Sequence, residues 1–360
     1  DMFERGGEGG GAAGAEGSAH ANERLNERLN VLVLMLDATS RSHLGRMVPR
    51  LFDALNELQR GGGLRLYDFR GYSIVGYNSM PNMAPFLVGS DAADLAAALS
   101  SAAKEAPTIW ADFKRHGART FLLEEIHDGC ADLAQGGTSS ASKYFHGRAS
   151  AANAPDHAPW QIFCQPELRP CCDDPASILR PGRRQCIGGV DLHAHLLDYT
   201  RRFWEGHPPQ QRLMGLVNLM TAHEHFMTRL GILDSDLPPF LQGLAHRLRS
   251  DTALLIISDH GTHGVWYNDF AIGQAEHRQP AFLLSLPERF AAANPAGDGA
   301  LRRNQARRLT SFDVHATLQH LAAWPTMPRP SLEATSLFVD LSPNRTCEQA
   351  RVPAKFCIEV

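Results

Sequence analysis

Three apolar segments of the 360-residue sequence end on residues that commonly bind metals. Asp37 follows "VLVLML", His223 follows "LMGLVNLMT" by one residue, and Asp259 and His260 follow "ALLIIS". These runs predict buried strands, and ligand sites in open parallel sheets lie beyond the carboxyl ends of the strands. A lone Asp in such a position most often caps the next helix, but three endings at one edge favour a common site. Mixed carboxylate and imidazole ligands indicate a divalent metal with open positions for substrate.

A serine in "GYNSMPN" could supply the nucleophile for such a metal site. Ser79 lies just before a helix that Pro81 is expected to begin, where the positive end of the helix dipole stabilises anions. A metal held by Asp37, Asp259 and His260 would lower the pKa of the Ser79 hydroxyl and activate it. The alternative is that Ser79 only caps the helix, which is a common role of serine.

The rest of the sequence alternates between strand and helix patterns. Strands are predicted at 31–36, 66–75, 119–124, 213–221, 253–258 and 281–286. Helices are predicted at 42–59, 81–87, 193–204, 236–249 and 312–322. This alternation predicts an α/β fold with a mostly parallel sheet and helices on both faces. Residues 130–190, with their Pro, Gly and Cys, break the rhythm and are expected to form an irregular excursion over the sheet edge.

The composition is that of an ordinary globular protein, with 43% hydrophobic and 21% charged residues. The formal net charge of −4 gives no electrostatic reason to expect nucleic-acid binding. No apolar run approaches the roughly 20 residues of a membrane span, so any membrane anchor is expected upstream of Asp1. Residues 1–29, whose first part is rich in Gly and Ala, are expected to be disordered. A catalytic domain is expected over 30–340, and a disulfide-stapled tail over 341–360.

The seven cysteines show no regular zinc-ligand spacing and favour disulfides. Cys347 and Cys357, ten positions apart in the tail, are predicted to pair with each other. The adjacent Cys171 and Cys172 are expected to take different partners from Cys130, Cys164 and Cys186. A glycosylation sequon at Asn344 lies beside Cys347. Together these features predict a secreted or lumenal glycoprotein.

An ordered series of motifs resembles a eukaryotic family of sulfatase-like proteins of unassigned function. The motifs are "LDATSR", "GYNSMPN", "SDHG", "AEHRQP", "RLTSFDVHATLQHL" and "NRTCEQARVPAKFC". That family belongs to the alkaline phosphatase superfamily, with the sulfatases, lipoteichoic acid synthases and phosphoethanolamine transferases. The resemblance implies an alkaline-phosphatase-like sandwich. It also implies Ser79 as the nucleophile and a metal shell made of Asp37, Ser79, Asp259 and His260.

The resemblance implies further roles around this shell. His277, in "AEHRQP", is similar to a downstream His that assists catalysis, and His223 is similar to a His near the anionic group of the substrate. Asn82 and Arg278 lie in the same motifs as Ser79 and His277 and are predicted to bind substrate. Zinc is the expected ion, with manganese or calcium as alternatives.

One departure separates this sequence from the sulfatases. Sulfatases form formylglycine within a C/S-x-P/A-x-R motif, whereas the string from Ser79 to Met83 has no Arg at its last position. An unmodified Ser suits phosphoryl transfer. We therefore expect a metal-dependent hydrolase or transferase of phosphate esters, acting on a small molecule, a glycoconjugate or a lipid-linked substrate. The alternatives are a sulfatase of glycan sulfate esters and an inactive protein that binds anionic glycans or serves in adhesion.

Other histidines in the sequence have weaker patterns. His193 and His195 lie two apart on a predicted helix and are expected to be surface or packing residues. His315 is expected to position the C-terminal helix. Asp156 and His157 lie on the excursion, where they could line the substrate pocket or pack the loop.

Overall fold

A six-stranded mixed sheet forms the centre of the protein. The computed structural model describes residues 28–91, 108–125, 152–158, 186–224, 226–262, 264, 266–327 and 334–358. The sheet order is β2-β8-β7-β1-β6-β3. Its strands are β1 Asn30–Leu36, β2 Leu64–Asp68, β3 Arg119–Glu124, β6 Leu213–Leu219, β7 Thr252–Ile257 and β8 Phe282–Pro287. Pairing is parallel between β1 and its neighbours β6 and β7, and between β3 and β6, whereas β8 is antiparallel to both β7 and β2. The expected mostly parallel sheet is confirmed, with β8 as its antiparallel member.

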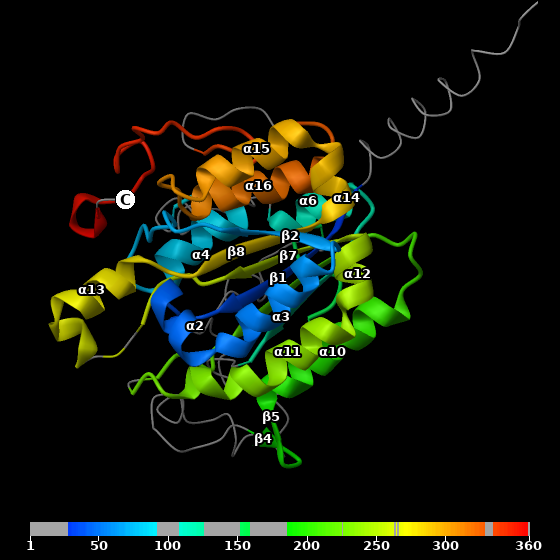
Figure 1. The fold of residues 1–360 in the computed structure, drawn as a ribbon, viewed down its shortest axis with the longest axis horizontal. Coiled ribbons are helices and arrows are strands. Elements are labelled where there is room, and N and C mark those ends of the chain that lie inside the picture. Colours follow the sequence, from blue (N-terminus) through cyan, green and yellow to red (C-terminus); the bar gives the residue numbers. More distant parts are fainter. Residues whose placement is uncertain are drawn as a thin grey trace, which may run out of the picture.

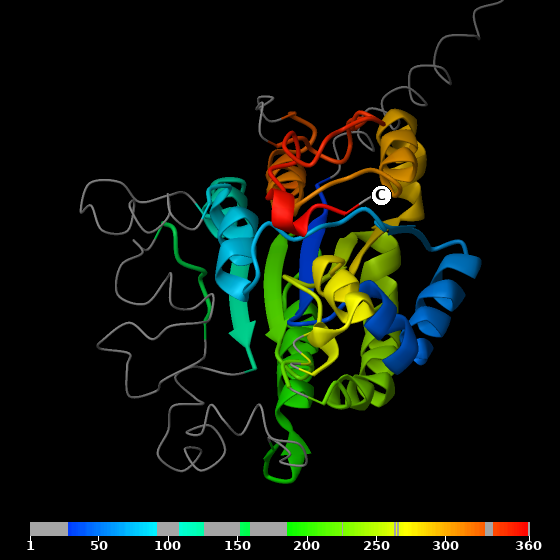
Figure 2. The ribbon, with the colours of Figure 1, turned by 90° about the vertical axis from the view of Figure 1, so that its left-hand side faces the viewer.

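Helices cover both faces of this sheet (Figure 1; Figure 2). One face carries α4 Ser79–Val88, α6 Ile109–Arg115, α14 Glu288–Ala293, α15 Pro295–Asn304 and α16 Ser311–Ala323. The other carries α2 Arg41–Met47, α3 Pro49–Arg60, α10 Leu192–Gly206, α11 Leu233–Gly243 and α12 Ala245–Ser250. The short turn η2 Arg229–Ile232 leads into α11 and buries Leu230 in the same layer, whereas α13 Ala271–Arg278, η3 Tyr267–Asp269 and η4 Ala354–Phe356 lie outside the two layers. The strand β4 Cys186–Ile187 pairs with β5 Val190–Asp191 in a separate hairpin.

The central strand β1 shows why its sequence is a continuous apolar run. Alternate side chains point to opposite faces of a strand, so Val31, Val33 and Met35 enter the core beneath α4, α6 and α16. Leu32, Leu34 and Leu36 enter the core beneath the helices of the other face. All seven residues of β1 are buried, as expected for a strand that is covered on both sides.

Two predicted elements have different bounds in the structure. The single helix predicted over 42–59 is divided into α2 and α3 at Pro49, because proline has no N–H for the helical ladder and instead begins α3. The strand predicted over 66–75 ends at Asp68. The Phe69 amide still donates to Phe282 of β8, but the amides of Arg70 and Ser73 donate to the carbonyls of Gln305 and Leu309, so from Arg70 onward the segment bonds to loops.

The described part of the C-terminal tail packs against the body of the protein. The carboxylate of Asp313, at the start of α16, receives Arg345 at 2.7 Å and the backbone amides of Thr310 and Thr335 at 3.0 Å. The predicted disulfide between Cys347 and Cys357 is confirmed. This disulfide closes a loop whose apolar side chains pack on the segment before α4, in a small cluster formed by Ile74, Ala350, Val352 and Phe356.

Several sequence-based expectations lie outside the described residues. They are the disorder of residues 1–27, most of the 130–190 excursion and the pairings of Cys171 and Cys172. Within the excursion, Asp156 accepts hydrogen bonds from both the amide and the hydroxyl of Thr120, and His157 bridges to Phe121 of β3. This pair therefore packs along the edge strand. In the described ranges no helix combines the length and apolar character that crossing a bilayer requires.

Replacing Arg345 by Met is expected to destabilise the fold by about 3–5 kcal/mol, because it leaves the buried Asp313 carboxylate without its cationic partner. Burial raises the pKa of Asp313 and Arg345 opposes that rise. The deficit is therefore expected to grow as the pH rises from about 4 to 7, where the carboxylate must ionise. Thermal and urea unfolding at several pH values measure it. The matched control is Arg303→Met, whose pair with Asp340 is exposed to solvent and should leave the stability nearly unchanged.

Candidate active site

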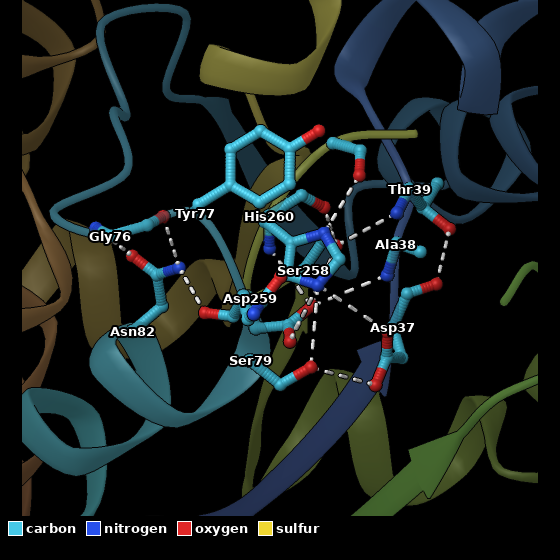
Figure 3. Close-up of polar contacts among 12 residues, drawn as sticks. Asp37, Ala38, Thr39, Gly76, Tyr77, Ser79, Asn82, Ser258, Asp259 and His260 are labelled. Carbon is cyan, nitrogen blue, oxygen red and sulfur yellow. Dashed lines mark hydrogen bonds and ion pairs between the residues drawn. The ribbon is translucent and has the colours of Figure 1, made fainter. Parts of the chain in front are cut away.

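The ends of two neighbouring strands bring three predicted metal ligands together. Asp37 directly follows β1, and Asp259 and His260 follow β7, which pairs with β1 in parallel. One potential ligand atom from each residue lies within 4.8 Å of the others, and all three residues are buried. His260 Nε2 is 3.5 Å from Asp259 Oδ2 and 3.9 Å from Asp37 Oδ1 (Figure 3). The predicted convergence of these side chains is therefore found in the structure.

The two oxygens of Asp259 have different surroundings. Oδ1 accepts hydrogen bonds from the amides of His260 at 2.8 Å and Ala38 at 3.3 Å, which fix the carboxylate. Oδ2 is buried and accepts no hydrogen bond from the described residues. His260 Nδ1 donates to the carbonyl of Gly261 at 2.8 Å, so the lone pair of Nε2 faces the cluster. Burial lowers the pKa of His260 and favours its neutral, metal-binding form. These donors fit a divalent cation.

Ser79 is the first residue of α4, and its hydroxyl faces this cluster rather than its own helix. The N-cap is Asn78, which makes no side-chain capping bond. The Ser79 hydroxyl lies 3.3 Å from His260 Nε2 and 3.5 Å from Asp37 Oδ2 (Figure 3). The alternative in which Ser79 merely caps α4 is therefore wrong.

A strained turn follows Asp37. Ala38 has a φ of 57°, which is uncommon for a residue other than glycine, and this turn lets its amide reach Asp259 Oδ1. The cap of the next helix, α2, is Ser40, whose hydroxyl accepts a hydrogen bond from the His43 amide at 2.9 Å. Asp37 thus has no capping role, and its carboxylate is directed to the cluster.

His277 ties α13 to the loop that carries Ser79. Its Nδ1 lies 3.0 Å from the carbonyl of Thr262, and its Nε2 lies 2.9 Å from the carbonyl of Tyr77. The His277 ring is 5.3 Å from the His260 ring and 4.3 Å from the Tyr77 ring. His277 therefore lies beside the cluster and holds its surroundings in place, and its predicted catalytic role stays a prediction.

Asn82 shapes the same loop. Its amide oxygen accepts from the amides of Val75 at 2.8 Å and Gly76 at 3.1 Å. Its amide nitrogen donates to the carbonyls of Gly76 at 2.8 Å and Asn78 at 2.9 Å. These four bonds hold the segment that leads into Ser79, and the predicted contact of Asn82 with substrate stays a prediction.

The other two predicted substrate-binding residues lie at the margin of the site. His223 is partly buried after β6, close enough for its charge to contribute to lowering the pKa of His260. Arg278 ends α13 and is partly buried, and its carbonyl accepts a hydrogen bond from the Ile74 amide. Their roles in binding substrate stay predictions.

Sequence reasoning missed a polar link between α13 and α2. The buried Glu276 receives the guanidinium of Arg46 at 2.7 and 2.8 Å and the hydroxyl of Ser40 at 2.8 Å. Burial alone would raise the pKa of Glu276, but the bonds from Arg46 and Ser40 bring it below its ordinary value. The one available signal was its position beside His277 in "AEHRQP".

Two other histidines have structural contacts. His193 is buried and lies 2.6 Å from Asp236, which links α10 to α11. His315 donates to the carbonyl of Phe86 at 3.0 Å and links α16 to α4, and burial lowers its pKa to about 4.

The family of the chain follows from a sequence match. Residues 13–136 and 168–359 match the family described as "Protein of unknown function (DUF229)". The chain belongs to the DUF229 family. Among curated proteins, none matches the sequence of this DUF229 chain.

Solved structures similar to the DUF229 chain share its architecture at low sequence identity. The C-terminal periplasmic domain of EcEptC from Escherichia coli, in complex with Zn, aligns with a TM-score of 0.53 and 11% identity over 92% of this chain and 97% of that one. The phosphonate monoester hydrolase of Agrobacterium radiobacter aligns with a TM-score of 0.55 and 13% identity, over 88% and 78%. The lipoteichoic acid synthase LtaP from Listeria monocytogenes gives 0.50 and 9%, over 89% and 80%. The alkaline-phosphatase-like fold implied by the motifs is confirmed.

Replacing Gly261 by Ala is expected to displace α13 from the cluster. A β-carbon at this position would lie 2.0 Å from the Glu276 carbonyl oxygen and 2.6 Å from His277 Cα, both of which are backbone atoms. We expect a loss of about 1–3 kcal/mol in stability. Urea unfolding measures this loss, and Gly45→Ala is the control, because a β-carbon there meets no atom within 4 Å. A Gly261→Ala protein as stable as the control would show that α13 is not packed as described.

Proposed function

We propose that this protein is a metal-dependent hydrolase or transferase of phosphate esters with Ser79 as its nucleophile. The observation that carries the proposal is the Ser79 hydroxyl at the start of α4, 3.3 Å from His260 and 3.5 Å from Asp37 in a buried cluster of metal-ligand type. The known activities of structural neighbours such as the phosphonate monoester hydrolase support the same class of chemistry.

The donor set would suit zinc, with manganese or calcium as alternatives. Asp37, Asp259 and His260 would hold the ion together with the Ser79 hydroxyl. Asp259 Oδ2 is already directed into the cluster without a hydrogen bond from the described residues, which supports a cation partner. A bound divalent cation would lower the pKa of the Ser79 hydroxyl and offset negative charge on the phosphoryl group.

Different residues of the chain would then act in different steps of the reaction. The Ser79 hydroxyl gives up its proton to solvent as its oxygen attacks phosphorus, a new O–P bond forms, and the bond from phosphorus to the ester oxygen breaks. The amino end of α4 stabilises the anionic phosphoryl group through its dipole. The departing alkoxide takes up a proton, and water or an acceptor alcohol later removes the phosphoryl group from Ser79.

We assign the proton donor to His223, which is partly exposed at the margin of the site. Both ring nitrogens of His277 already face carbonyl oxygens, so His277 would have to leave one of them to act as an acid. Arg278 and Asn82 remain the proposed contacts for the rest of the substrate.

An oxidising compartment is part of the proposal. The Cys347–Cys357 disulfide supports a secreted or lumenal location, where such bonds persist. Asn344 of the sequon is exposed, as a glycosylation acceptor must be. Substrates would then be extracellular or lumenal phosphate esters. Position 83, where the sulfatase motif that begins at residue 79 requires Arg, is Met, which argues against a formylglycine sulfatase. Mass spectrometry of the peptide containing residue 79 distinguishes an unmodified Ser from formylglycine.

Asp259→Asn is expected to abolish stoichiometric zinc binding while the fold remains. Asn keeps an oxygen acceptor for the amides of His260 and Ala38, but it replaces the open carboxylate oxygen with an amide and removes the charge. Isothermal titration with zinc and metal analysis of purified protein measure the change. Asp198→Asn, on the exposed surface of α10, is the control and should bind zinc like wild type. Unchanged zinc affinity in Asp259→Asn would contradict the assigned site.

Ser79→Ala is expected to lower turnover of the best phosphate ester by about 10³-fold or more, as removal of a nucleophile does. Stability should change by less than about 1 kcal/mol, because the Ser79 hydroxyl does not cap α4. Assays of phosphomonoesters, phosphodiesters and sulfate esters, with metal content and thermal unfolding in parallel, test this. The control is Ser235→Ala on the exposed side of α11. A fully active Ser79→Ala protein would remove Ser79 from the mechanism.

A further inference from the structure

Exposed apolar side chains gather around the candidate site. In the described ranges, seven large apolar residues are exposed. Five of them lie on segments that lead to or carry the predicted site residues, namely the loop before Ser79, the loops after β6 and β7, and the start of α13: Tyr77 50%, Phe226 51%, Trp266 54%, Phe270 58% and Ile272 59%. The remaining two, Val190 and Met327, lie on the β4–β5 hairpin and after α16. Single exposed apolar residues are ordinary, whereas several at one edge mark a contact surface.

Tyr77 connects this group to the catalytic cluster. It precedes Ser79 by two residues, and its ring lies 4.3 Å from the His277 ring, which is in turn 5.3 Å from the His260 ring. Figure 3 shows the Tyr77 ring on the other side of His260 from the Ser79 hydroxyl. Through His277, the half-exposed Tyr77 ring is the exposed apolar group that these ring contacts link to the cluster.

The other four residues continue outward from Tyr77. The Asn268 amide contacts the Tyr77 hydroxyl at 3.5 Å, which places η3 beside it. Trp266 directly precedes η3, Phe270 is the N-cap of α13, and Ile272 lies in the first turn of α13. In Figure 1, α13 and the segment before it project from the body of the protein.

Phe226 joins the group from the loop after β6. Its neighbour Met227 packs on the loop after β7, since a β-carbon at Gly264 would lie 2.5 Å from the Met227 sulfur and 3.1 Å from Tyr267 Cβ. The two loops are thus in contact. We define the apolar rim as Tyr77, Phe226, Trp266, Phe270 and Ile272.

We propose that the apolar rim binds the leaving group, and that the substrate is a phosphate ester of an apolar alcohol. This inference rests on the proposed function of Ser79. The nucleophile and ligands occupy the buried side of the site, and in-line attack drives the leaving group away from the Ser79 oxygen. In this proposal it departs toward solvent and meets the half-exposed ring of Tyr77, which lies beside His277. If the leaving-group oxygen carries an alkyl or aryl group, contact of that group with the apolar rim would bury the apolar surface of both.

The kinetic test uses ethyl, hexyl and decyl phosphate, whose alcohols have similar basicity, so the chemical step is alike. Wild-type kcat/KM is expected to rise about tenfold or more from ethyl to decyl phosphate. In the triple variant Trp266→Ser, Phe270→Ser and Ile272→Ser this ratio should fall toward one. The controls Val190→Ser and Met327→Ser replace equally exposed residues away from the site and should keep the wild-type ratio. If kcat/KM does not depend on the chain length of the alcohol, the inference is wrong, while the proposed function is unaffected.

A binding test separates the inference from catalysis. Ser79→Ala protein is titrated with ethyl and decyl phosphate, and the fluorescence of the exposed Trp266 is followed together with heat release. A dissociation constant about tenfold or more lower for decyl phosphate supports the apolar rim, whether or not the wild type turns over any ester. Equal constants overturn it.

Two other occupants of the apolar rim are outcomes of the same experiments. Sedimentation velocity tests for a dimer, and flotation with phosphatidylcholine vesicles tests for membrane contact. If the triple variant abolishes either association while the chain-length preference is absent, the rim belongs to a second copy or to a bilayer, and the inference is wrong.

Discussion

Asp37 and Asp259 follow two adjacent parallel strands, and both carboxylates are buried. The surrounding structure must offset the free energy that their removal from water costs. Two acidic groups withdrawn from water destabilise a fold unless cations or hydrogen bonds compensate them. One oxygen of Asp259 is compensated by backbone amides, including that of Ala38 in its left-handed conformation. The other lies 3.5 Å from His260 Nε2, and the same nitrogen lies 3.3 Å from the Ser79 hydroxyl. The strained turn at Ala38, the paired strands and the position of α4 together hold these two buried carboxylates next to groups that can compensate them.

The approach of α13 to the strand ends is a second requirement of the site. Gly261 provides the space, because any side chain there would enter the backbone of α13. Glu276, bound to Arg46 and Ser40, fixes α13 against α2 on one side. His277 fixes it against the Tyr77 loop on the other. The helix thus links the segment after Asp37 to the Ser79 loop, and Phe270 and Ile272 at its amino end are exposed.

The sequence predicts those features that depend on a strand and the residue that follows it. Asp37, Asp259 and His260 could be found because parallel strands place their carboxyl ends at one edge, which holds for any packing of the helices. The functions of Glu276 and Asn82 could not be found this way, since their partners lie on other segments and depend on how α13 and the 75–78 loop fold back. The strand predicted over 66–75 ended early for a related reason: from Arg70 onward its backbone bonds to other segments, and Ile74 packs with the tail.

The cluster of Ile74 with Ala350, Val352 and Phe356 bears on how the protein can be produced. The loop that ends in Ser79 rests on a segment closed by the Cys347–Cys357 disulfide. In a reducing bacterial cytosol this segment would be made without its covalent closure, and its packing behind the loop would weaken. An inactive preparation from such a host would then report on the redox history of the sample rather than on the chemistry of Ser79. Periplasmic or eukaryotic secretory expression is the appropriate source of protein for testing the function proposed for this chain.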